Sequence, residues 1–423
     1  MKVYLDMVGC RLNQSEIEKF ASNLRNLGHQ IVAEPAEADI AIVNTCTVTA
    51  SAAADSRKII RRIQRAGCGH IFATGCLATI EPETILNLPA VDGVFPNQTK
   101  NEIVASFPSL QPSFQPQFRT PIPGKHKRTR AFIKVQDGCD NFCTFCITRI
   151  ARGASRSSEK DEIFPDVESA ISGGVKEIVL TGVNLGSWGR DFDSSSSLSR
   201  LIKDLVNTFD IPRIRLSSIE PWDVDDELTE IISLPNFAPH LHLPLQSGCD
   251  RTLKRMGRNM SSLKFEKLVQ RMREIRQDIA ITTDIIVGFP EESEDDFAHS
   301  LNFVKKISFA GGHVFRYSPR NGTPAALFPE KISGDILRER SQRMREVIEV
   351  SQKAFEEKAL GEIVTVLWEK SKQLSASHFR LQGLSGNYLN VETTSCEDLT
   401  NEMSTVQIKE KKEKGVYGEI INI

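Results

Sequence analysis

Three apolar segments near the start of the chain each end in a cysteine, and helical patterns separate them. The segments read VYLDMVGC, DIAIVNTC and HIFATGC, and they end at Cys10, Cys46 and Cys76. Because residues 15–28 and 51–67 between them have helical patterns, the order of elements predicts a parallel sheet. Parallel strands end at one edge of a sheet, where open α/β sheets bind ligands. We therefore expect the three thiols to meet in a metal site, although free cysteines are also common as small buried residues.

Composition indicates the class of protein, its cellular compartment and the roles that its cysteines can have. The chain has 423 residues, 40% of them hydrophobic and 26% charged, which is typical of a globular protein of about three domains. Neither a secretory signal nor a membrane-spanning run is recognisable, so we expect a cytoplasmic protein with no membrane partner. In a reducing compartment the nine cysteines favour metal ligands, reactive thiols or packing residues over disulfides. The net charge of −2 means that any nucleic-acid surface is a local patch.

The remaining cysteines outside the cysteine-rich loop described below are not expected to be ligands. Cys68 precedes its strand and would lie at the opposite edge of the sheet, so we exclude it from the metal site. Cys249 and Cys396 are interpreted as ordinary thiols.

Residues 108–130 interrupt the regular patterns. The segment PSLQPSFQPQFRTPIPGKHKRTR carries five prolines and ends in a basic run, which excludes a regular helix or a central strand. It predicts a domain boundary, and the basic run at 125–130 is either a solvated surface or a contact to RNA phosphates.

A second series of strands follows the boundary. The segments FIKVQDG, EIVLTGVN, RIRLSSIE, HLHLPLQSG, ITTDIIVGFP and GGHVFRYSP recur with helical patterns between most of them. Six such strands predict a partial (β/α)6 barrel with its chemistry at the carboxyl ends of the strands. Polar and glycine residues at those ends are candidates for binding a polar cofactor, although each is also compatible with simple turn chemistry. They are Gly182, Asn184, Ser218, Glu220, Gln246, Ser247 and Gly288.

Cys139, Cys143 and Cys146 lie in one loop after the first of these strands, with the spacing C-x3-C-x2-C. Structural zinc requires four protein ligands, whereas an iron–sulfur cluster held by three thiolates keeps one iron open to a cofactor or substrate. Phe142 and Phe145 are expected to shield such a cluster or to serve only in packing.

This spacing after a barrel strand resembles the radical S-adenosylmethionine superfamily. The resemblance implies that the open iron binds S-adenosylmethionine and that one electron cleaves it to a 5′-deoxyadenosyl radical, which removes hydrogen from an unactivated carbon. The wider pattern is similar to the methylthiotransferase family, which adds a second [4Fe-4S] cluster on cysteines matching Cys10, Cys46 and Cys76. The resemblance covers essentially the whole chain. Its motifs here are GCRLNQSE, NTCTVT, ATGCLA, RIRLSSIEPWD, HLHLPLQSGCDRTLKRMGR, TDIIVGFPEE and FRYSPRNGTPAA.

The last part of the chain agrees with this resemblance. A helical stretch precedes short strands that predict a small antiparallel β barrel, which looks like the RNA-binding TRAM module of the family. Its candidate RNA contacts are Trp368, Lys370, Lys372, Arg380 and Tyr388.

The expected architecture is therefore α/β with a C-terminal β barrel. A parallel α/β domain at 1–107 would bind the second cluster, and the linker at 108–130 would lead to a radical S-adenosylmethionine barrel at 131–334. A connecting helix at 335–360 and the TRAM-like barrel at 361–423 complete the chain.

Two positions depart from the family pattern. Thr148 and Arg149 stand soon after the last cysteine of the loop, where many relatives have Ile-Pro. The resemblance therefore does not predict the path of the chain after this loop. Pro96 stands where a glycine is common, and we have no functional account of it.

The resemblance implies a tRNA methylthiotransferase with two [4Fe-4S] clusters and S-adenosylmethionine. GCRLNQSE and NTCTVT look most like the branch that modifies threonylcarbamoyladenosine at position 37 of the tRNA anticodon stem-loop, with an electron donor such as flavodoxin or ferredoxin. The alternatives are the branches for isopentenyladenosine and for a ribosomal-protein aspartate, and a non-catalytic iron–sulfur protein that binds RNA or senses redox state.

Overall fold

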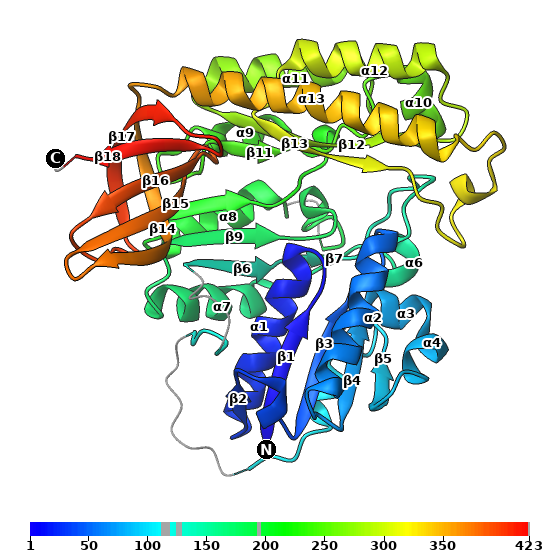
Figure 1. Cartoon of the computed structure of the whole chain (residues 1–423), viewed down its shortest axis with the longest axis vertical. Helices are drawn as coiled ribbons and strands as arrows, with labels where there is room; N and C mark the ends of the chain where they lie inside the picture. Colours follow the sequence, from blue (N-terminus) through cyan, green and yellow to red (C-terminus); the bar gives the residue numbers. More distant parts are fainter. Residues whose placement is uncertain (111–118, 124–128, 193–195, 422–423) are drawn as a thin grey trace. The chain divides into compact units, whose positions relative to one another are not determined.

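The computed structural model describes residues 1–110, 119–123, 129–192 and 196–421. Much of the expected linker at 108–130, including residues 125–128 of the basic run, lies outside the described residues. The chain divides into two compact units (Figure 1). The first unit contains residues 1–141, 146–175 and 180–184, and the second contains residues 142–145, 176–179 and 185–423.

The first unit contains a five-stranded parallel sheet in the order β2-β1-β3-β4-β5. The expected strands and helices are present, and β2 and β5 are two further strands at its edges. Both are short, and residues 91–95 contain a glycine that weakens the strand pattern. The strands are β1 (Lys2–Met7), β2 (Gln30–Val32), β3 (Ile40–Thr45), β4 (Ile71–Gly75) and β5 (Val91–Phe95), and the helices are α1 (Arg11–Asn26), η1 (Pro35–Glu37), α2 (Ala50–Arg65), α3 (Cys76–Ile80), α4 (Pro82–Leu86) and α5 (Glu102–Ala105).

Both faces of this sheet are covered because strand side chains alternate between them. Leu5 and Ile42 pack on one face with Phe20 of α1. Val43 packs on the other face with Ile60 of α2. The ends of the strands are the places that remain for polar chemistry.

The first unit also contains the start of the second strand series. Here β6 (Arg130–Lys134) leads into β7 (Gln136–Asp137), which pairs with β8 (Arg156–Ser157). Between them lie the loop with Cys139 and Cys146 and the short helix α6 (Thr148–Arg152), and α7 (Lys160–Ser172) follows.

All six expected strands of the second series are present. They form the sheets β10-β9-β6 and β11-β12-β13, and isolated parallel bridges such as Ser218↔His242 connect the β10 and β11 segments, which confirms a partial barrel. Helices α11, α12 and α13 lie over the second sheet (Figure 1). The elements are β9 (Glu177–Thr181), η2 (Leu185–Ser187), α8 (Leu198–Thr208), β10 (Arg213–Leu216), η3 (Pro221–Asp223), α9 (Asp226–Ile232), β11 (His240–His242), α10 (Asp250–Arg255), α11 (Ser262–Ile275), β12 (Ala280–Val287), α12 (Glu294–Ile307), β13 (Gly311–Arg316), η4 (Pro324–Leu327) and α13 (Gly334–Lys358).

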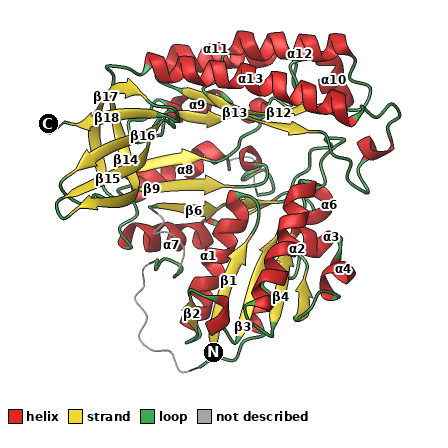
Figure 2. Cartoon of the chain, viewed as in Figure 1, coloured by secondary structure: helices red, strands yellow, loops and turns green. Residues whose placement is uncertain are grey.

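The last five strands close into a small barrel in the order β14-β15-β16-β18-β17 (Figure 2). One neighbouring pair, β16 and β18, is parallel, where we expected only antiparallel pairs. An odd number of strands cannot close with every neighbour antiparallel, which explains the difference. The strands are β14 (Ile363–Ser375), β15 (His378–Ser385), β16 (Asn390–Ser395), β17 (Met403–Lys411) and β18 (Val416–Ile420).

The structure separates the candidate RNA contacts of this barrel into two groups. Lys370, Lys372 and Arg380 are exposed, and Lys372 lies directly opposite Arg380 in the β14–β15 ladder. Trp368 is fully buried in the barrel core, so the expectation that it contacts RNA was wrong. Tyr388 stacks on His240 with ring centroids 4.1 Å apart, so its ring is engaged within the protein.

A buried ion cluster attaches this barrel to the strands of the second unit. Arg215 donates through Nε to Glu177 Oε1 over 2.7 Å, and Arg213 donates through Nη1 to Glu177 Oε2 over 3.2 Å. The two arginines also donate to backbone carbonyls of the barrel, at Thr365, Leu384 and Ser385. Glu177 thus holds two cations that hydrogen-bond to the β barrel. Within the described residues, no helix combines the length and apolar composition needed to cross a membrane.

We expect Glu177→Gln to lower the free energy of unfolding by about 3–5 kcal/mol, because it leaves two buried guanidinium groups without their counter-ion. Urea denaturation measures this loss. Glu230→Gln removes the exposed partner of Lys203 and should cost at most about 1 kcal/mol. Equal costs for the two variants would contradict the structural role of Glu177.

Candidate functional site

Cys10, Cys46 and Cys76 lie at the carboxyl ends of three neighbouring strands. Cys10 follows β1 and is the N-cap residue of α1, Cys46 follows β3, and Cys76 follows β4 as the first residue of α3. Cys46 and Cys76 are buried, and Cys10 is exposed. Cys68 precedes β4, and its thiol donates to the His70 carbonyl over 3.3 Å. The structure therefore places the three candidate ligands at one edge of the sheet and Cys68 at the other.

The absence of a side chain at Gly9 makes room for Cys46. Its φ is +109°, and a Cβ atom at this position would lie 2.7 Å from Cys46 Cβ and 2.8 Å from Cys46 Sγ. Only glycine adopts this backbone conformation without strain and also leaves room for the thiol.

Burial raises the pKa of two of these thiols. It raises the pKa of the Cys46 thiol to about 11, and the proximity of the other two ionisable thiols, Cys76 and Cys10, adds to the shift. Burial also raises the pKa of Cys76, although the Arg152 guanidinium opposes the change. Thiolate ligation would therefore require a metal to displace the protons.

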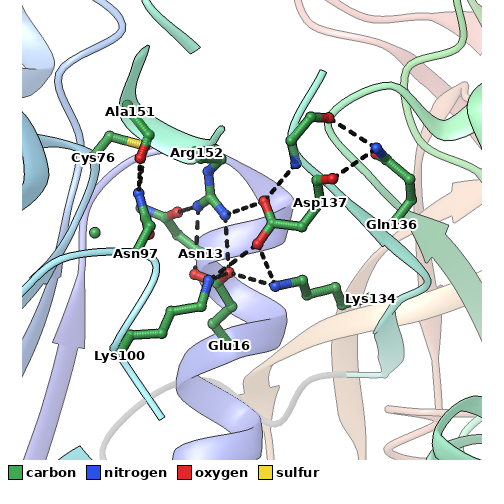
Figure 3. A network of polar contacts seen from close by, with 12 residues as sticks. Asn13, Glu16, Cys76, Asn97, Lys100, Lys134, Gln136, Asp137, Ala151 and Arg152 are labelled. Carbon is green, nitrogen blue, oxygen red and sulfur yellow. Dashed lines mark hydrogen bonds and ion pairs between the residues drawn. The ribbon is translucent and has the colours of Figure 1, made fainter. Parts of the chain in front are cut away.

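A buried network of charged side chains lies near Cys76 (Figure 3). Arg152 donates through Nη1 to Glu16 Oε1 over 3.0 Å and to Asp137 Oδ1 over 2.9 Å. Lys134 donates to Asp137 over 2.6 Å and to Glu16 over 3.1 Å. Lys100 donates to the same two carboxylates. We call these five residues the Arg152 network.

The two carboxylates of the Arg152 network stay ionised inside the protein. Burial alone would raise the pKa of Glu16, but Arg152, Lys100 and Lys134 outweigh it and hold the pKa well below its usual range. The same three cations lower the pKa of Asp137 against the effect of burial.

Two asparagines connect this network to the sulfur atoms. Asn13 Oδ1 accepts a hydrogen bond from Arg152 Nη2 over 2.7 Å and lies 3.8 Å from Cys10 Sγ. Asn97 Nδ2 donates to Cys76 Sγ over 3.7 Å and to the Ala151 carbonyl over 2.9 Å (Figure 3). The Oδ1 atom of Asn97 is buried and has no hydrogen-bond partner within the described chain, which leaves it available to a polar ligand.

The loop of the C-x3-C-x2-C motif offers backbone amides to its sulfurs. The amide of Asn141 donates to Cys139 Sγ over 3.4 Å, and the amide of Thr148 donates to Cys146 Sγ over 3.5 Å. Cys139 itself donates its amide to the Gly153 carbonyl over 3.1 Å, so the segment after α6 supports the start of the loop.

Cys143 belongs to the second unit, where Arg258 is its partner. Arg258 Nη1 donates to Cys143 Sγ over 3.7 Å, and the guanidinium binds both oxygens of Glu220 over 3.0 and 2.6 Å. It also lies over the Trp222 ring, 4.5 Å from the centroid. A buried cation is thus fixed against one sulfur of the motif.

The two aromatic residues of the loop differ from each other. Phe145 packs edge-on against Phe289 with ring centroids 6.4 Å apart, in agreement with a packing role. Phe142 is 75% exposed, which does not agree with a packing role, and its shielding of a cluster stays a prediction.

The candidate cofactor residues have different surroundings. In the first unit, Gly182 is half-buried and Asn184 is buried. The backbone amide of Asn184 donates to Gln136 Oε1 over 2.8 Å. In the second unit, Ser218 and Gln246 each form an isolated bridge to a neighbouring strand, and Glu220 is engaged by Arg258.

Two of the candidates have structural explanations. The Ser247 hydroxyl accepts from the Cys249 amide over 3.2 Å and lies 3.5 Å from the Ser300 hydroxyl on α12. Gly288 has a φ of +70°, and a Cβ there would lie 1.8 Å from a side-chain carbon of Leu337. A cofactor contact by either residue stays a prediction.

Cys10, Cys46 and Cys76 supply thiols, the usual ligands of an iron–sulfur cluster, at one edge of the sheet. Within the described residues, no group of three His, Cys, Asp or Glu side chains is placed to hold one metal ion. A [4Fe-4S] cluster is larger than an ion and separates its ligands further, and thiolates are its usual ligands. The buried thiols, the neighbouring Arg152 and the unpartnered Asn97 Oδ1 agree with such a group.

Sequence reasoning did not find the Arg152 network or Arg258. Each of these charged residues alone is typical of a solvated surface. The available signal was local: Asn13 and Glu16 are three residues apart in GCRLNQSE, which puts them on one face of a helix that begins after Cys10.

Comparisons with known proteins cover most of the chain. Residues 2–96 match the family described as "Uncharacterized protein family UPF0004", and residues 133–304 match the radical SAM superfamily.

Curated relatives of this chain are named for tRNA-modifying activities. The chain is 32% identical to the threonylcarbamoyladenosine tRNA methylthiotransferase of Bacillus subtilis, over 95% of this chain and 92% of that protein. It is 36% identical to the enzyme of the same name from Thermotoga maritima, over 98% and 96%. It is also 34% identical to the tRNA-2-methylthio-N(6)-dimethylallyladenosine synthase of Ehrlichia canis, over 88% of each chain.

Solved structures show a similar fold. The radical S-adenosylmethionine methyltransferase TsrM of Kitasatospora setae matches with a TM-score of 0.57 and 16% identity, over 77% of this chain and 75% of that chain.

We expect Gly9→Ala to disturb the cysteine site and Gly67→Ala to leave it intact. Both glycines have positive φ, but a Cβ at Gly67 meets nothing within 4 Å. Gly67→Ala should therefore cost only about 1–2 kcal/mol of backbone strain, whereas Gly9→Ala adds about 1–3 kcal/mol of overpacking. Denaturation and iron content after anaerobic reconstitution measure both effects. Equal losses in the two variants would show that the contact with Cys46 is unimportant.

We also expect acid to destabilise the first unit through Glu16 and Asp137. Because their folded pKa values lie below the unfolded values of about 4.3 and 3.9, their stabilisation is complete above about pH 5 and is lost as the pH falls. In Glu16→Gln protein the free energy of unfolding at pH 7 should be lower and its pH dependence below pH 5 weaker, by up to about 1.4 kcal/mol per pH unit. Denaturation of iron-free protein between pH 3.5 and 7 tests this, and an unchanged slope would contradict it.

Proposed function

Because this chain belongs to the radical S-adenosylmethionine methylthiotransferase family, we propose that it inserts a methylthio group at C2 of N6-threonylcarbamoyladenosine at position 37 of tRNA. The observation that supports this proposal is the position of Cys10, Cys46 and Cys76 at the carboxyl ends of three neighbouring strands, in a chain that also has the C-x3-C-x2-C loop. Relatives that span nearly the whole chain bear the name of this activity.

The six cysteines divide into two proposed cluster sites. Cys139, Cys143 and Cys146 would hold the cluster that binds S-adenosylmethionine, and Cys10, Cys46 and Cys76 would hold a second [4Fe-4S] cluster. When bound, the first group supplies the electron that cleaves S-adenosylmethionine to the radical that removes hydrogen from C2, and the second supplies the sulfur, which another S-adenosylmethionine methylates.

The residues of this chain would set the surroundings of both sites. Arg258 donates to Cys143, and the amides of Asn141 and Thr148 donate to the other two loop sulfurs. Such hydrogen bonds favour the thiolate form that a metal requires. Asn97 orients the Cys76 sulfur in the same way.

The domains proposed for these tasks are those expected from the sequence. Residues 1–107 would bind the second cluster, residues 131–334 would bind S-adenosylmethionine, and residues 361–423 would bind the anticodon stem-loop. Lys370, Lys372 and Arg380 are exposed cations on adjoining strands of that barrel, which suits a phosphate backbone. We propose flavodoxin or ferredoxin as the electron donor and the cytoplasm as the location.

Nucleoside mass spectrometry tests the substrate. Cells that lack their own methylthiotransferases should gain 2-methylthio-threonylcarbamoyladenosine when they express this protein. A gain of the methylthio derivative of isopentenyladenosine would move the substrate to the sister branch. No tRNA change, with both clusters present, would contradict a tRNA substrate and direct the search to a ribosomal-protein aspartate or to a non-catalytic iron–sulfur protein.

Cysteine variants test which of the two proposed cluster sites serves which step of the reaction. Cys76→Ala should lose the second cluster and abolish methylthiolation while S-adenosylmethionine is still cleaved to 5′-deoxyadenosine under anaerobic reduction. Cys143→Ala should abolish that cleavage. Cys68→Ala, in the connection before β4, and the exposed Cys396→Ala are the matched controls and should keep both activities. Cleavage by Cys143→Ala protein would refute the role of the loop.

A further inference from the structure

One cation reaches the Cys10, Cys46 and Cys76 site from a distant part of the sequence. Arg152 lies at the end of α6, and its side chain is 2% exposed. We propose that Arg152 is a positioning residue that raises the reduction potential of the cluster held by Cys10, Cys46 and Cys76, by fixing net positive charge beside its thiolates. The inference rests on the proposed function for the presence of that cluster.

The contacts of Arg152 fix it from three sides. Glu16 and Asp137 accept from Nη1, and Asn13 Oδ1 accepts from Nη2. Asn13 lies next to the Cys10 sulfur, so one asparagine oxygen joins the cation to a ligand.

The backbone before Arg152 is held as well. The Ala151 carbonyl accepts from Asn97 Nδ2, which also donates to Cys76 Sγ. Asn13 thus connects Arg152 to Cys10, and Asn97 connects the neighbouring Ala151 to Cys76. The positive charge of Arg152 also acts on Cys46.

The Arg152 network carries a net positive charge. Arg152, Lys100 and Lys134 are three cations, and they keep the carboxylates of Glu16 and Asp137 ionised although burial opposes it. The side chains of Arg152, Lys100, Glu16 and Asp137 are each at most 8% exposed, and that of Lys134 is 22% exposed. Water therefore screens this charge poorly.

A buried positive charge favours the reduced form of a neighbouring cluster. Reduction adds one electron, taken from an external reductant, to a group that its thiolates already make negative. Net charge and hydrogen bonds to the sulfurs are among the factors that set cluster potentials. Removing a cation from the network should lower the potential, and removing a carboxylate should raise it. A role limited to folding predicts no such reversal of sign.

The experiment is a redox titration of the full-length chain in which Cys139, Cys143 and Cys146 are all changed to Ala, so that only the second cluster contributes to the spectrum. The one-electron midpoint is followed by electron paramagnetic resonance. We expect Arg152→Gln to lower the reduced-to-oxidised ratio at a fixed potential about tenfold, which is a shift of about 59 mV for one electron. We expect Glu16→Gln to raise this ratio and Arg152→Lys to stay near the parent.

Lys134→Met is the second variant, because Lys134 is partly exposed and its substitution is less disruptive. It should lower the ratio less than Arg152→Gln does, and it replaces that variant if Arg152→Gln protein does not hold a cluster. Shifts of the same sign in Arg152→Gln and Glu16→Gln, or no shift in Lys134→Met and Glu16→Gln, would overturn the inference. Absence of iron and sulfide from the parent protein would overturn the assignment of the second cluster itself, a result that analysis of metal content separates from the others.

Discussion

The buried pairing of Arg152 with Glu16 and Asp137 is the interaction on which the first unit depends. It joins α1, which begins after Cys10, to β7 and α6, which lie on either side of the cysteine loop. Buried ion pairs contribute little net stability, because desolvation offsets much of their attraction, but the loss of one partner is costly. The main effect of the network is therefore to fix the position and the charge of Arg152 beside the three thiols, and its net contribution to stability is small.

The second unit uses a similar arrangement on a smaller scale. Arg258 is buried, its charge is balanced by Glu220, and it donates to Cys143 Sγ. Each unit thus places one guanidinium near cysteine sulfur and holds it with a carboxylate. Arginine suits this task because its planar fork donates to a carboxylate and to a third group at the same time. The carboxylates limit the net charge that has to be buried.

The sequence predicted the elements whose signal is local. The strands and helices around Cys10, Cys46 and Cys76 followed from periodicity, and so did the six strands of the partial barrel. The edge strand β2 has only three residues, too few for a periodic pattern, and the glycine in β5 weakens its strand pattern. Trp368 was misassigned because aromatic residues in a small barrel serve equally in its core or on its surface, and only the register of β14 decides between them. Arg152 and Glu16 are 136 residues apart, so no local pattern could pair them.

Substrate choice has to reside outside the two cysteine sites. Curated relatives named for threonylcarbamoyladenosine and for dimethylallyladenosine are similarly close to this chain, at 32% and 34% identity. Both names describe tRNA adenosines that differ in the group attached at N6. The proposed ligands of iron and S-adenosylmethionine would serve the same chemistry in both cases and would not distinguish the two groups. A polar threonylcarbamoyl group requires hydrogen-bonding partners and an apolar dimethylallyl group excludes them, because an unpaired buried polar group costs about 1–3 kcal/mol. The residues that select the substrate are therefore to be sought among polar side chains outside the two proposed cluster sites.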